Sequence, residues 1–424
     1  MKYNPTLHKL SNGVTVILDP MDLETTNIKI HFNTGSRDEA SHEYGLTHFC
    51  EHMFGKGSTR FPSKKFIDDY MDYWGGTRNA ATGNKSLDFY GRILAKNLDK
   101  LIDFFGDTLQ NALFDTDKID IERRVICDEL RRAQDRPDRQ FTDFISKNLF
   151  DYATFSTRNL GSVESIMSFT REQMKEFLSR RLSAKNCIIG ISGKIVDTDA
   201  TLSLLEKSFS FLPTHNVSEN TDIKYTPSVI HNLQSDKKNV RLAILFPDIF
   251  SPRYEDRYNN FAIGRFERFY IKALSDILRQ ENGLVYGFSG YGVGNEKFAL
   301  TGFYTETAPE NIEQVVSLIA KNTYDIYTNP KITPDDLDRY NRKDCLGDAD
   351  WMESAGRRCD KLIGFYRNYG RLYDFYETVK MFEQITVSDV IEKTRCYFDG
   401  PISIITQGAD FKSDIKMVWD KSYK

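Results

Sequence analysis

The sequence contains no long apolar segment. None of its apolar runs approaches the roughly 18 residues that a helix needs to cross a bilayer. Residues 1–10 are polar and have neither the apolar core of a secretory signal nor the arginine-rich, amphipathic pattern of a presequence. We therefore expect no membrane span, no signal peptide and no presequence, and a cytoplasmic location.

The sequence also lacks an excess of positive charge. Its 57 Lys and Arg residues are outnumbered by 61 Asp and Glu residues, and the net charge of −4 gives no electrostatic reason to expect nucleic-acid binding. A small negative charge mildly favours basic peptides as ligands. The six cysteines show no Cys-x-x-Cys spacing, so we expect free thiols in a reducing compartment.

Histidine is scarce as well, with seven in the chain, but two of the seven have an informative spacing. His48 and His52 stand in the stretch His-Phe-Cys-Glu-His. On a helix they lie about 40° apart around the axis and about 6 Å apart along it, so both imidazoles can bind one metal ion. Glu51 lies on the same face. This is the inverted zinc-protease motif, and the alternative is two satisfied polar residues on an amphipathic helix.

A catalytic zinc site usually needs a third protein ligand and an open position for water. Residues 117–132 have the pattern of a helix, with Ile119, Glu122, Ile126 and Glu129 at spacings of three and four. Glu122 and Glu129 are two turns apart and point the same way, so one can bind the metal while the other orients a ligand. The spacing alone leaves open that both are solvated glutamates.

These motifs resemble those of a known family, the pitrilysin/insulinase-type inverzincin zinc peptidases. The similarity is to the short two-domain form that includes the β subunit of mitochondrial processing peptidase and bacterial relatives. In that family a Glu-x6-Glu pair ends about 77 residues after the second histidine, and Glu122 and Glu129 match it. The match covers nearly the whole chain and extends to Gly45-Leu46, Met53, Lys56-Gly57, Gly75-Gly76, Asn79-Ala80 and Asp135-Arg136-Pro137.

The resemblance implies a zinc-dependent endopeptidase with one zinc ion per chain. His48, His52 and Glu129 would bind the metal, and Glu122 would orient one of these ligands without binding the metal itself. Zinc would activate a water molecule for which Glu51 is the general base. An extended peptide would add to an edge strand. By resemblance, that strand contains Asn79, Ala80, Ala81 and Thr82, which without the resemblance would be an ordinary hairpin strand.

Arg279 and Tyr286 resemble the family's Arg-x6-Tyr element, which binds substrate and helps to stabilise the oxyanion. Without the resemblance they would be a surface and a core residue. In members of this length a partner chain presents these groups and closes a chamber. We therefore expect a homodimer with composite active sites that cleaves peptides or unfolded, presequence-like segments. The alternatives are a non-catalytic subunit that has kept the fold, or one half of a heterodimer.

The hydrophobic periodicity predicts two similar series of strands and helices. In the first series we expect strands at 8–19 (a hairpin), 26–33, 78–83, 86–94 and 187–191. We expect helices at 43–54, 97–110, 117–132, 140–152 and 171–181, and one more that starts after Ser63 as its N-cap and ends at Gly75. In the second we expect strands at 240–246, 284–291, 298–305 and 402–408, and helices at 259–279, 310–327 and 334–345.

The segments 169–193 and 385–408 are alike, which indicates one unit duplicated with a period of about 215 residues. We expect an α+β fold of two homologous domains, each a mainly antiparallel sheet packed with helices. The expected parts are a zinc-binding catalytic domain at 1–211, a Pro-, Ser-, Asn- and Thr-rich linker at 212–236, and a substrate-binding domain without a metal site at 237–424.

Overall fold

The computed structural model describes residues 3–151, 159–219, 224–234, 236–294 and 298–424. The chain forms two compact units, each with one sheet and a set of helices. The first unit consists of Met1–Asp143, Ser156–Asn220 and Ala349–Tyr373, and the second of Phe144–Phe155, Thr221–Asp348 and Asp374–Lys424. The predicted α+β class with two similar domains is confirmed.

The sheet of the first unit has the strand order β1-β2-β6-β3-β5-β4. The β2–β6 pair is parallel, and the other neighbouring strands are antiparallel. The strands are β1 Thr6–Lys9, β2 Thr15–Pro20, β3 Thr25–Phe32, β4 Thr77–Thr82, β5 Leu87–Leu94 and β6 Cys187–Gly193. β1 and β2 form the predicted hairpin, in which the turn residue Gly13 has φ 98°.

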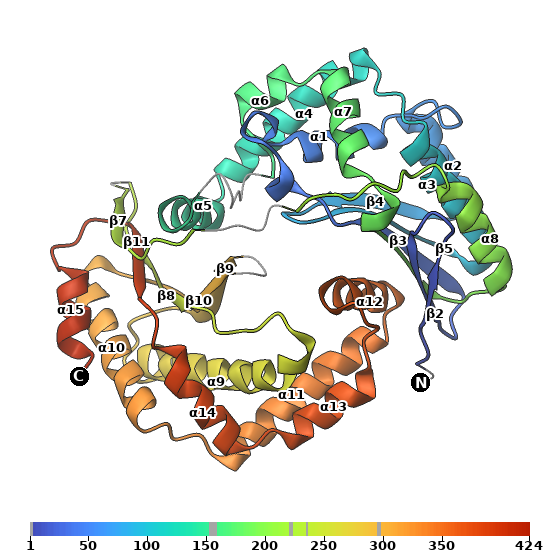
Figure 1. Ribbon diagram of the computed structural model, residues 1–424. Coiled ribbons are helices and arrows are strands. Elements are labelled where there is room, and N and C mark those ends of the chain that lie inside the picture. The colour runs from blue at the N-terminus through green and yellow to red at the C-terminus, as the bar shows by residue number, and fades with distance from the viewer. Residues whose placement is uncertain (1–2, 152–158, 220–223, 235, 295–297) are drawn as a thin grey trace. The chain divides into compact units, whose positions relative to one another are not determined.

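Helices cover one face of this sheet (Figure 1). Ile28, Ile30 and Phe32 alternate along β3 and point into the core that these helices complete. These helices are α1 Leu46–Phe54, α2 Lys64–Trp74, α3 Leu98–Gln110, α4 Thr116–Gln134, α6 Val163–Ser168, α7 Arg171–Arg181 and α8 Thr198–Phe209. Helix α5 (Pro137–Leu149) is divided between the two units after Asp143 and adds no residue to this core. Ser63 caps α2 through the backbone N–H of Phe66, as predicted.

The other face of the first sheet is covered by α12 (Ala355–Tyr369), a helix from late in the chain. Arg358 and Asp19 are both fully buried there, and Nε of Arg358 donates to Asp19 at 2.6 Å. Lys29 on β3 donates to Asp360 on α12 at 2.9 Å. The predicted first domain, residues 1–211, does not include this helix. The helix lies far along the chain from the first sheet and belongs to the first unit only through its packing.

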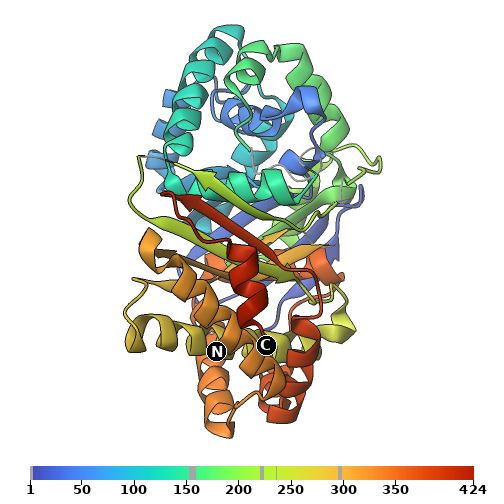
Figure 2. The same cartoon turned by 90° about the vertical axis from the view of Figure 1, so that its left-hand side faces the viewer.

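The sheet of the second unit has the order β7-β11-β8-β10-β9, again with one parallel pair, β7–β11. Its strands are β7 Val229–Leu233, β8 Val240–Pro247, β9 Phe288–Gly294, β10 Ala299–Thr307 and β11 Ser403–Gly408. Its helices are α9 Arg257–Ser275 with a π-helical extension Asp276–Glu281, α10 Ile312–Thr328, α11 Pro334–Met352, α13 Phe375–Gln384, α14 Val387–Tyr397 and α15 Ile415–Ser422. Helices α10 and α15 lie side by side (Figure 2).

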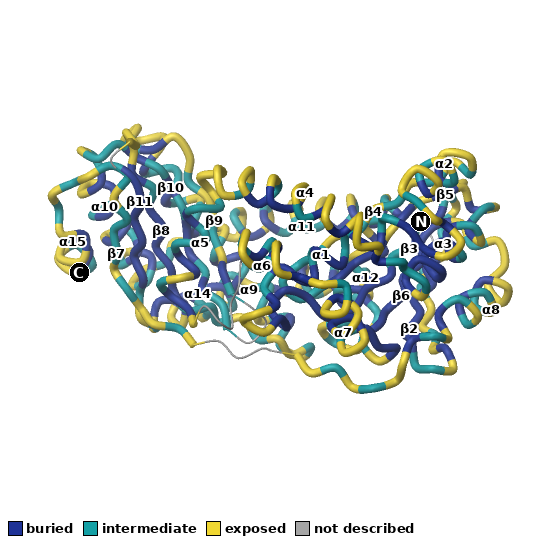
Figure 3. Tube along the Cα trace, turned by 90° about the horizontal axis from the view of Figure 1, so that it is seen from above, coloured by how far each residue is buried: buried dark blue, intermediate teal, exposed yellow. Residues whose placement is uncertain are grey.

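The two sheets share one topology. Strands β2, β6, β3, β5 and β4 of the first correspond in order and direction to β7, β11, β8, β10 and β9 of the second. The starts of β3 and β8 are 215 residues apart, close to the predicted period. In both units the buried residues follow the central strands (Figure 3).

Two details differ from the sequence-based predictions. The first strand of the second hairpin begins at Phe288 rather than at residue 284, so Tyr286 lies in a loop and not on a strand. The hydroxyls of Thr305 and Thr307 on β10 donate to the carbonyls of Gly287 and Leu284, and these side-chain bonds take the place of a backbone ladder.

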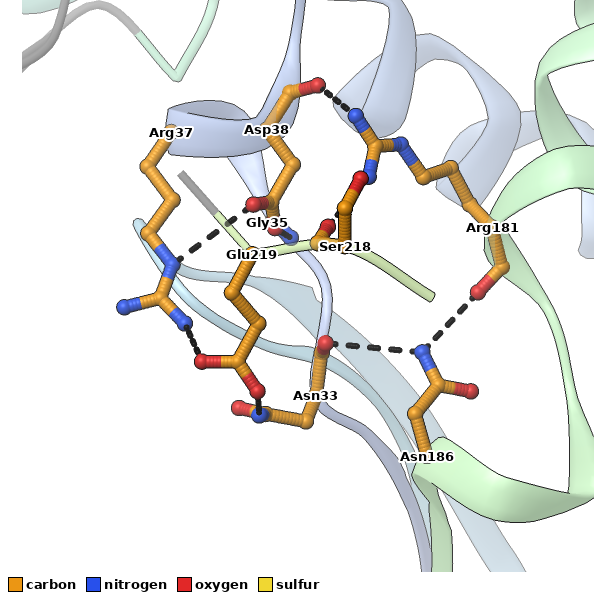
Figure 4. Close-up of polar contacts among 8 residues, drawn as sticks. All are labelled: Asn33, Gly35, Arg37, Asp38, Arg181, Asn186, Ser218 and Glu219. Carbon is orange, nitrogen blue, oxygen red and sulfur yellow. Dashed lines mark hydrogen bonds and ion pairs between the residues drawn. The ribbon is translucent and has the colours of Figure 1, made fainter. Parts of the chain in front are cut away.

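The predicted linker also contains regular structure, since β7 lies within it. Before β7, Arg181 donates to the carbonyl of Ser218 at 2.8 Å, and Arg37 donates to Glu219 at 2.9 Å (Figure 4). These bonds hold residues 213–219 against the first unit, whereas residues 220–223 and 235 lie outside the described parts of the chain. None of the described helices is both long and apolar enough to span a membrane.

Candidate metal centre

The motif helix α1 begins at a position that accepts only glycine. Gly45 has φ 94°, and a Cβ atom there would lie 2.7 Å from the carbonyl oxygen of Leu160. Glycine has no side chain to cap the helix, and Glu39 supplies the cap instead. Its carboxylate accepts hydrogen bonds from the backbone N–H groups of Gly45 at 2.8 Å and Thr47 at 2.7 Å.

The cap is a buried acid. Burial raises the pKa of Glu39 to about 8, although its bonds from Thr47 and Gly45 act in the opposite direction. The two oxygen atoms of this carboxyl group accept the N–H groups of Gly45 and Thr47 and so fix the direction of the first turn. Glu39 therefore sets how α1 presents its histidines.

His48 and His52 lie side by side on α1, with ring centres 4.6 Å apart. Glu129 reaches them from α4, with its Oε2 atom 3.8 Å from Nε2 of His48 and 3.5 Å from Nε2 of His52. One potential ligand atom from each of the three residues lies within 4.8 Å of the others. The structure thus brings together the three residues that the sequence suggested as metal ligands.

Glu122 lies behind this group on the same helix as Glu129, and it is buried. Its Oε2 atom is 2.9 Å from Nδ1 of His52, and its Oε1 atom is 2.5 Å from the Lys56 ammonium. Burial opposes ionisation of Glu122, but the bonds from His52 and Lys56 outweigh it and hold its pKa below the ordinary value. A carboxylate at Nδ1 keeps the proton there and leaves Nε2 as a free donor atom.

His48 is suited to bind metal rather than to carry charge. Burial, helped by the nearby charges of His52 and Arg139, lowers the pKa of His48 to about 3. A metal ion needs the neutral imidazole, so little proton competition is expected at neutral pH. Two imidazoles and a carboxylate form the protein donor set of a catalytic zinc site.

Glu51 points toward the edge strand β4. The hydroxyl of Thr82 on β4 donates to Oε2 of Glu51 at 2.7 Å. Burial raises the pKa of Glu51, and the charge of Glu129 adds to this effect, while Thr82 and His52 oppose it. A carboxyl group of raised pKa at the rim of a metal site has the properties of a general base.

The other predicted site residues divide between the two units. Asn79, Ala80, Ala81 and Thr82 all lie on β4, which is the last strand of its sheet and pairs with β5. Arg279 and Tyr286 belong to the second unit. Tyr286 is 91% exposed, and the guanidinium of Arg279 lies 5.8 Å from the centre of its ring.

Sequence reasoning missed Glu39 and Arg139. Glu39 had one available signal, because a helix that starts at glycine without Ser, Thr, Asp or Asn needs its cap from elsewhere. The sequence did not show which residue would supply that cap. Arg139 on α5 approaches His48 only through the packing of the helices, for which the sequence offered no signal.

Comparison with known proteins matches most of the chain to one family. Residues 15–161 match the family described as insulinase, peptidase family M16, and residues 168–343 match the peptidase M16 inactive domain. An uncharacterized zinc protease of Rickettsia felis is 25% identical over 98% of this chain and 100% of its own length. The mitochondrial-processing peptidase subunit beta of Dictyostelium discoideum is 24% identical over 90% of this chain and 83% of its own.

The fold is also similar to solved structures. The crystal structure of a protease from Helicobacter pylori superposes with a TM-score of 0.80 at 18% identity, covering 96% of this chain and 100% of that one. At this identity the likeness concerns the fold alone.

Proposed function

The chain belongs to peptidase family M16, and from this premise we propose that it is a zinc-dependent endopeptidase that cleaves peptides or unfolded, presequence-like segments. The observation that carries the proposal is the grouping of His48, His52 and Glu129 around one point. Within the described residues no second group of this kind occurs, so we expect one zinc ion per chain.

Each residue of the site has a distinct role in this proposal. Bound zinc would polarise the scissile carbonyl and lower the pKa of a water molecule. Glu51 accepts the proton of the attacking water and delivers it to the leaving amine. The hydroxyl of Thr82 holds the Glu51 carboxylate in one orientation. Glu122 keeps the Nδ1 proton of His52 in place, so that Nε2 remains a ligand.

The substrate would bind as an added strand on β4. This strand ends the sheet order, so one row of its backbone N–H and C=O groups faces away from β5. Pairing with those groups needs an extended peptide and reads few of its side chains. Thr82 on the same strand contacts Glu51, so a peptide on β4 runs next to the proposed base.

The decisive test is Glu51→Gln in the full-length protein. Cleavage of a fluorogenic peptide should fall by about 10²–10⁴-fold, because the general base is lost. Elemental analysis should still find one zinc ion per chain, since the three ligands remain. Glu24→Gln, which changes an exposed glutamate paired with Lys194, is the matched control and should cleave normally. A fully active Glu51→Gln protein would end the proposal, and a wild type without zinc or cleavage would favour a non-catalytic subunit.

We also propose a homodimer in which Arg279 and Tyr286 of one copy serve the metal site of the other. This rests on the resemblance to the family and on the exposure of Tyr286, which leaves its hydroxyl open to a ligand. A heterodimer with a different partner is the alternative, and light scattering of the purified chain distinguishes the two.

Subunit mixing tests the composite site directly. Glu51→Gln and Tyr286→Phe proteins should each be nearly inactive. In a mixed population, a heterodimer joins an intact Glu51 with an intact Tyr286 at one of its two sites, so about a quarter of wild-type activity should return. A mixture that stays inactive, or a fully active monomer in solution, would contradict the composite site.

A further inference from the structure

A cavity of about 210 Å³ lies beside the metal cluster in the first unit. Its lining includes Glu51 and His52 of α1 and also Asn79 and Ala80 of β4. A peptide paired with β4 therefore passes the mouth of this cavity close to the scissile bond. Typical ligand pockets measure about 300–1,000 Å³, so this smaller volume suits a single amino-acid side chain.

Gly55 helps to open the cavity. It follows α1 with φ −82°, a conformation that any residue adopts, so backbone geometry does not require glycine here. A Cβ atom at Gly55 would lie 3.6 Å from Nη1 of Arg78. A larger side chain at this position would fill the space in front of the guanidinium, and its absence leaves Arg78 accessible.

The charged groups of the lining are mostly cationic. Lys56, Lys64 and Arg78 line the cavity, and Glu51 is the single acidic residue among the described lining residues. Lys56 is paired with the buried Glu122. Lys64 and Arg78 share one partner, because both contact Asp68, at 2.6 Å and 3.1 Å.

Arg78 has unused hydrogen-bonding capacity. Only its Nη2 atom bonds to a described residue, and its Nε atom is buried with no acceptor among the residues that the structure describes. The Nη1 atom lies in front of Gly55 and has no hydrogen-bond partner among the described residues, so a ligand that supplies a charged acceptor can form a charge-assisted hydrogen bond there. Arg78 is held in place for such a ligand, since its guanidinium lies 5.7 Å from the ring centre of Phe104.

The floor of the cavity is aromatic. Phe54, Phe89, Phe104 and Phe105 line it, and all four are buried. Such a floor accepts methylene groups, while the cations and the open N–H groups accept a terminal anion. A glutamate side chain combines two methylenes with a carboxylate, and it matches both features.

We propose that this cavity binds an acidic side chain, best a glutamate, next to the scissile bond, so that the preferred substrates carry a glutamate there. The inference rests on the proposed peptidase function and adds a substrate class to it. It runs against the net charge of the chain, which mildly favours basic peptides, because the local charges around the cavity act at much shorter range.

The first test uses quenched, alanine-rich peptides that differ at one position beside the scissile bond, which mass spectrometry of the products locates. The zinc-loaded wild type should cleave the Glu peptide with a kcat/KM about 10–100-fold above the Gln peptide, the range of a hydrogen bond to a charged group. The Lys peptide should be poorer still. Equal or faster cleavage of the Lys peptide would overturn the proposal.

Two substitutions should shift the preference in opposite directions. Arg78→Met keeps apolar contact with Phe104 but removes the donors, so the Glu/Gln ratio should fall to near one while cleavage of the Ala peptide persists. Asp68→Asn frees Arg78 and Lys64 from their shared partner, so the ratio should rise. Lys65→Met is the matched control. Lys65 lies on α2, like Lys64 and Asp68, but it pairs with Asp69 and does not line the cavity. An unchanged ratio in Arg78→Met would refute the assignment.

A binding measurement separates this proposal from the peptidase assignment. Fluorescein-labelled Glu and Gln peptides are titrated with zinc-loaded Glu51→Gln protein, and anisotropy reports their affinities. A tighter Glu peptide whose advantage disappears in the Glu51→Gln/Arg78→Met protein supports the cavity, even if the wild type cleaves nothing. Equal affinities for the two peptides would overturn the cavity assignment and leave the peptidase assignment to its own test.

Discussion

The two units share a sheet topology but use the same pair of helices differently. In the first unit, α1 follows the central strand β3, and α4 is the second helix after the β4–β5 hairpin. In the second unit, α9 and α11 hold these places after β8 and the β9–β10 hairpin. In each unit, a carboxylate on the second helix faces nitrogen-bearing side chains on the first helix. The two units differ in which side chains these are.

In the second unit the facing groups form an ion pair. Asp344 on α11 lies 2.9 Å from Nη2 of Arg265 on α9 and also contacts Arg268. The side chains of Arg265 and Asp344 are 3% and 11% exposed, so the pair is largely buried. Because arginine stays protonated, Arg265 remains ion-paired with the Asp344 carboxylate, which is then not available to bind a metal ion. In the first unit, burial keeps His48 neutral instead, and a carboxylate that faces a neutral imidazole remains available to a metal ion.

The comparison predicts that removing the carboxylate has opposite consequences in the two units. Glu129→Ala should abolish zinc binding. The loss should exceed the about 10–100-fold expected for Glu122→Gln, which changes only the group that hydrogen-bonds the ligand His52. The metal-free protein should keep its stability, because Glu129 is 42% exposed. Asp344→Asn should retain zinc and instead destabilise the protein by on the order of 3 kcal/mol, because it leaves Arg265 buried and unpaired.

Zinc titration and thermal unfolding of the metal-free proteins measure both effects. The comparison fails if Glu129→Ala binds zinc like the wild type, or if Asp344→Asn loses zinc while its unfolding temperature is unchanged.

The shared topology predicts a second effect, on stability, that should be equal in the two units. Gly193 ends β6 with φ 128°, and Gly408 ends β11 with φ 133°. A Cβ atom at these positions would lie 2.3 Å and 2.1 Å from a backbone carbonyl oxygen. Gly193→Ala and Gly408→Ala should therefore each cost more than the about 1–3 kcal/mol of backbone strain alone.

Gly13→Ala provides the control for this pair. Gly13 has φ 98°, but a Cβ atom there meets nothing within 4 Å, so only the strain remains. Unfolding temperatures of the three variants make the comparison. Equal losses for all three would show that the close carbonyl contacts at Gly193 and Gly408 do not matter.

Local patterns allowed much of this fold to be predicted from the sequence. Ser63 and Gly75 bracket α2 because a cap and a left-handed glycine act within one turn of the helix. The spacing of His48, Glu51 and His52 fixes their common face for the same reason. The choice of Glu129 as third ligand needed the family resemblance, since spacing left Glu122 equally possible.

Features that depend on distant segments could not be predicted. The sheet face that α12 covers is set by the buried pair of Asp19 and Arg358, which are more than 300 positions apart. Tyr286 was expected on a strand because its neighbours are apolar. The threonine hydroxyls that bond to the carbonyls of Leu284 and Gly287 come from β10, and nothing in the sequence near residue 286 indicates them.

The last expected effect, at most about 1.4 kcal/mol for each pH unit, concerns Glu39; among the described residues no side chain caps α9 in the corresponding way. Its folded pKa of about 8 exceeds the ordinary 4.5, so between these values the folded protein holds a proton that the unfolded chain has released. Stability from this group is therefore fully present below pH 4.5 and is lost as the pH rises through 8, by up to about 1.4 kcal/mol per pH unit. Chemical unfolding of metal-free wild type and Glu39→Gln at pH 5, 6, 7 and 8 isolates this slope, because the other titrating groups are common to both proteins. Parallel pH profiles would show that the cap of the motif helix stays ionised and that burial does not control it.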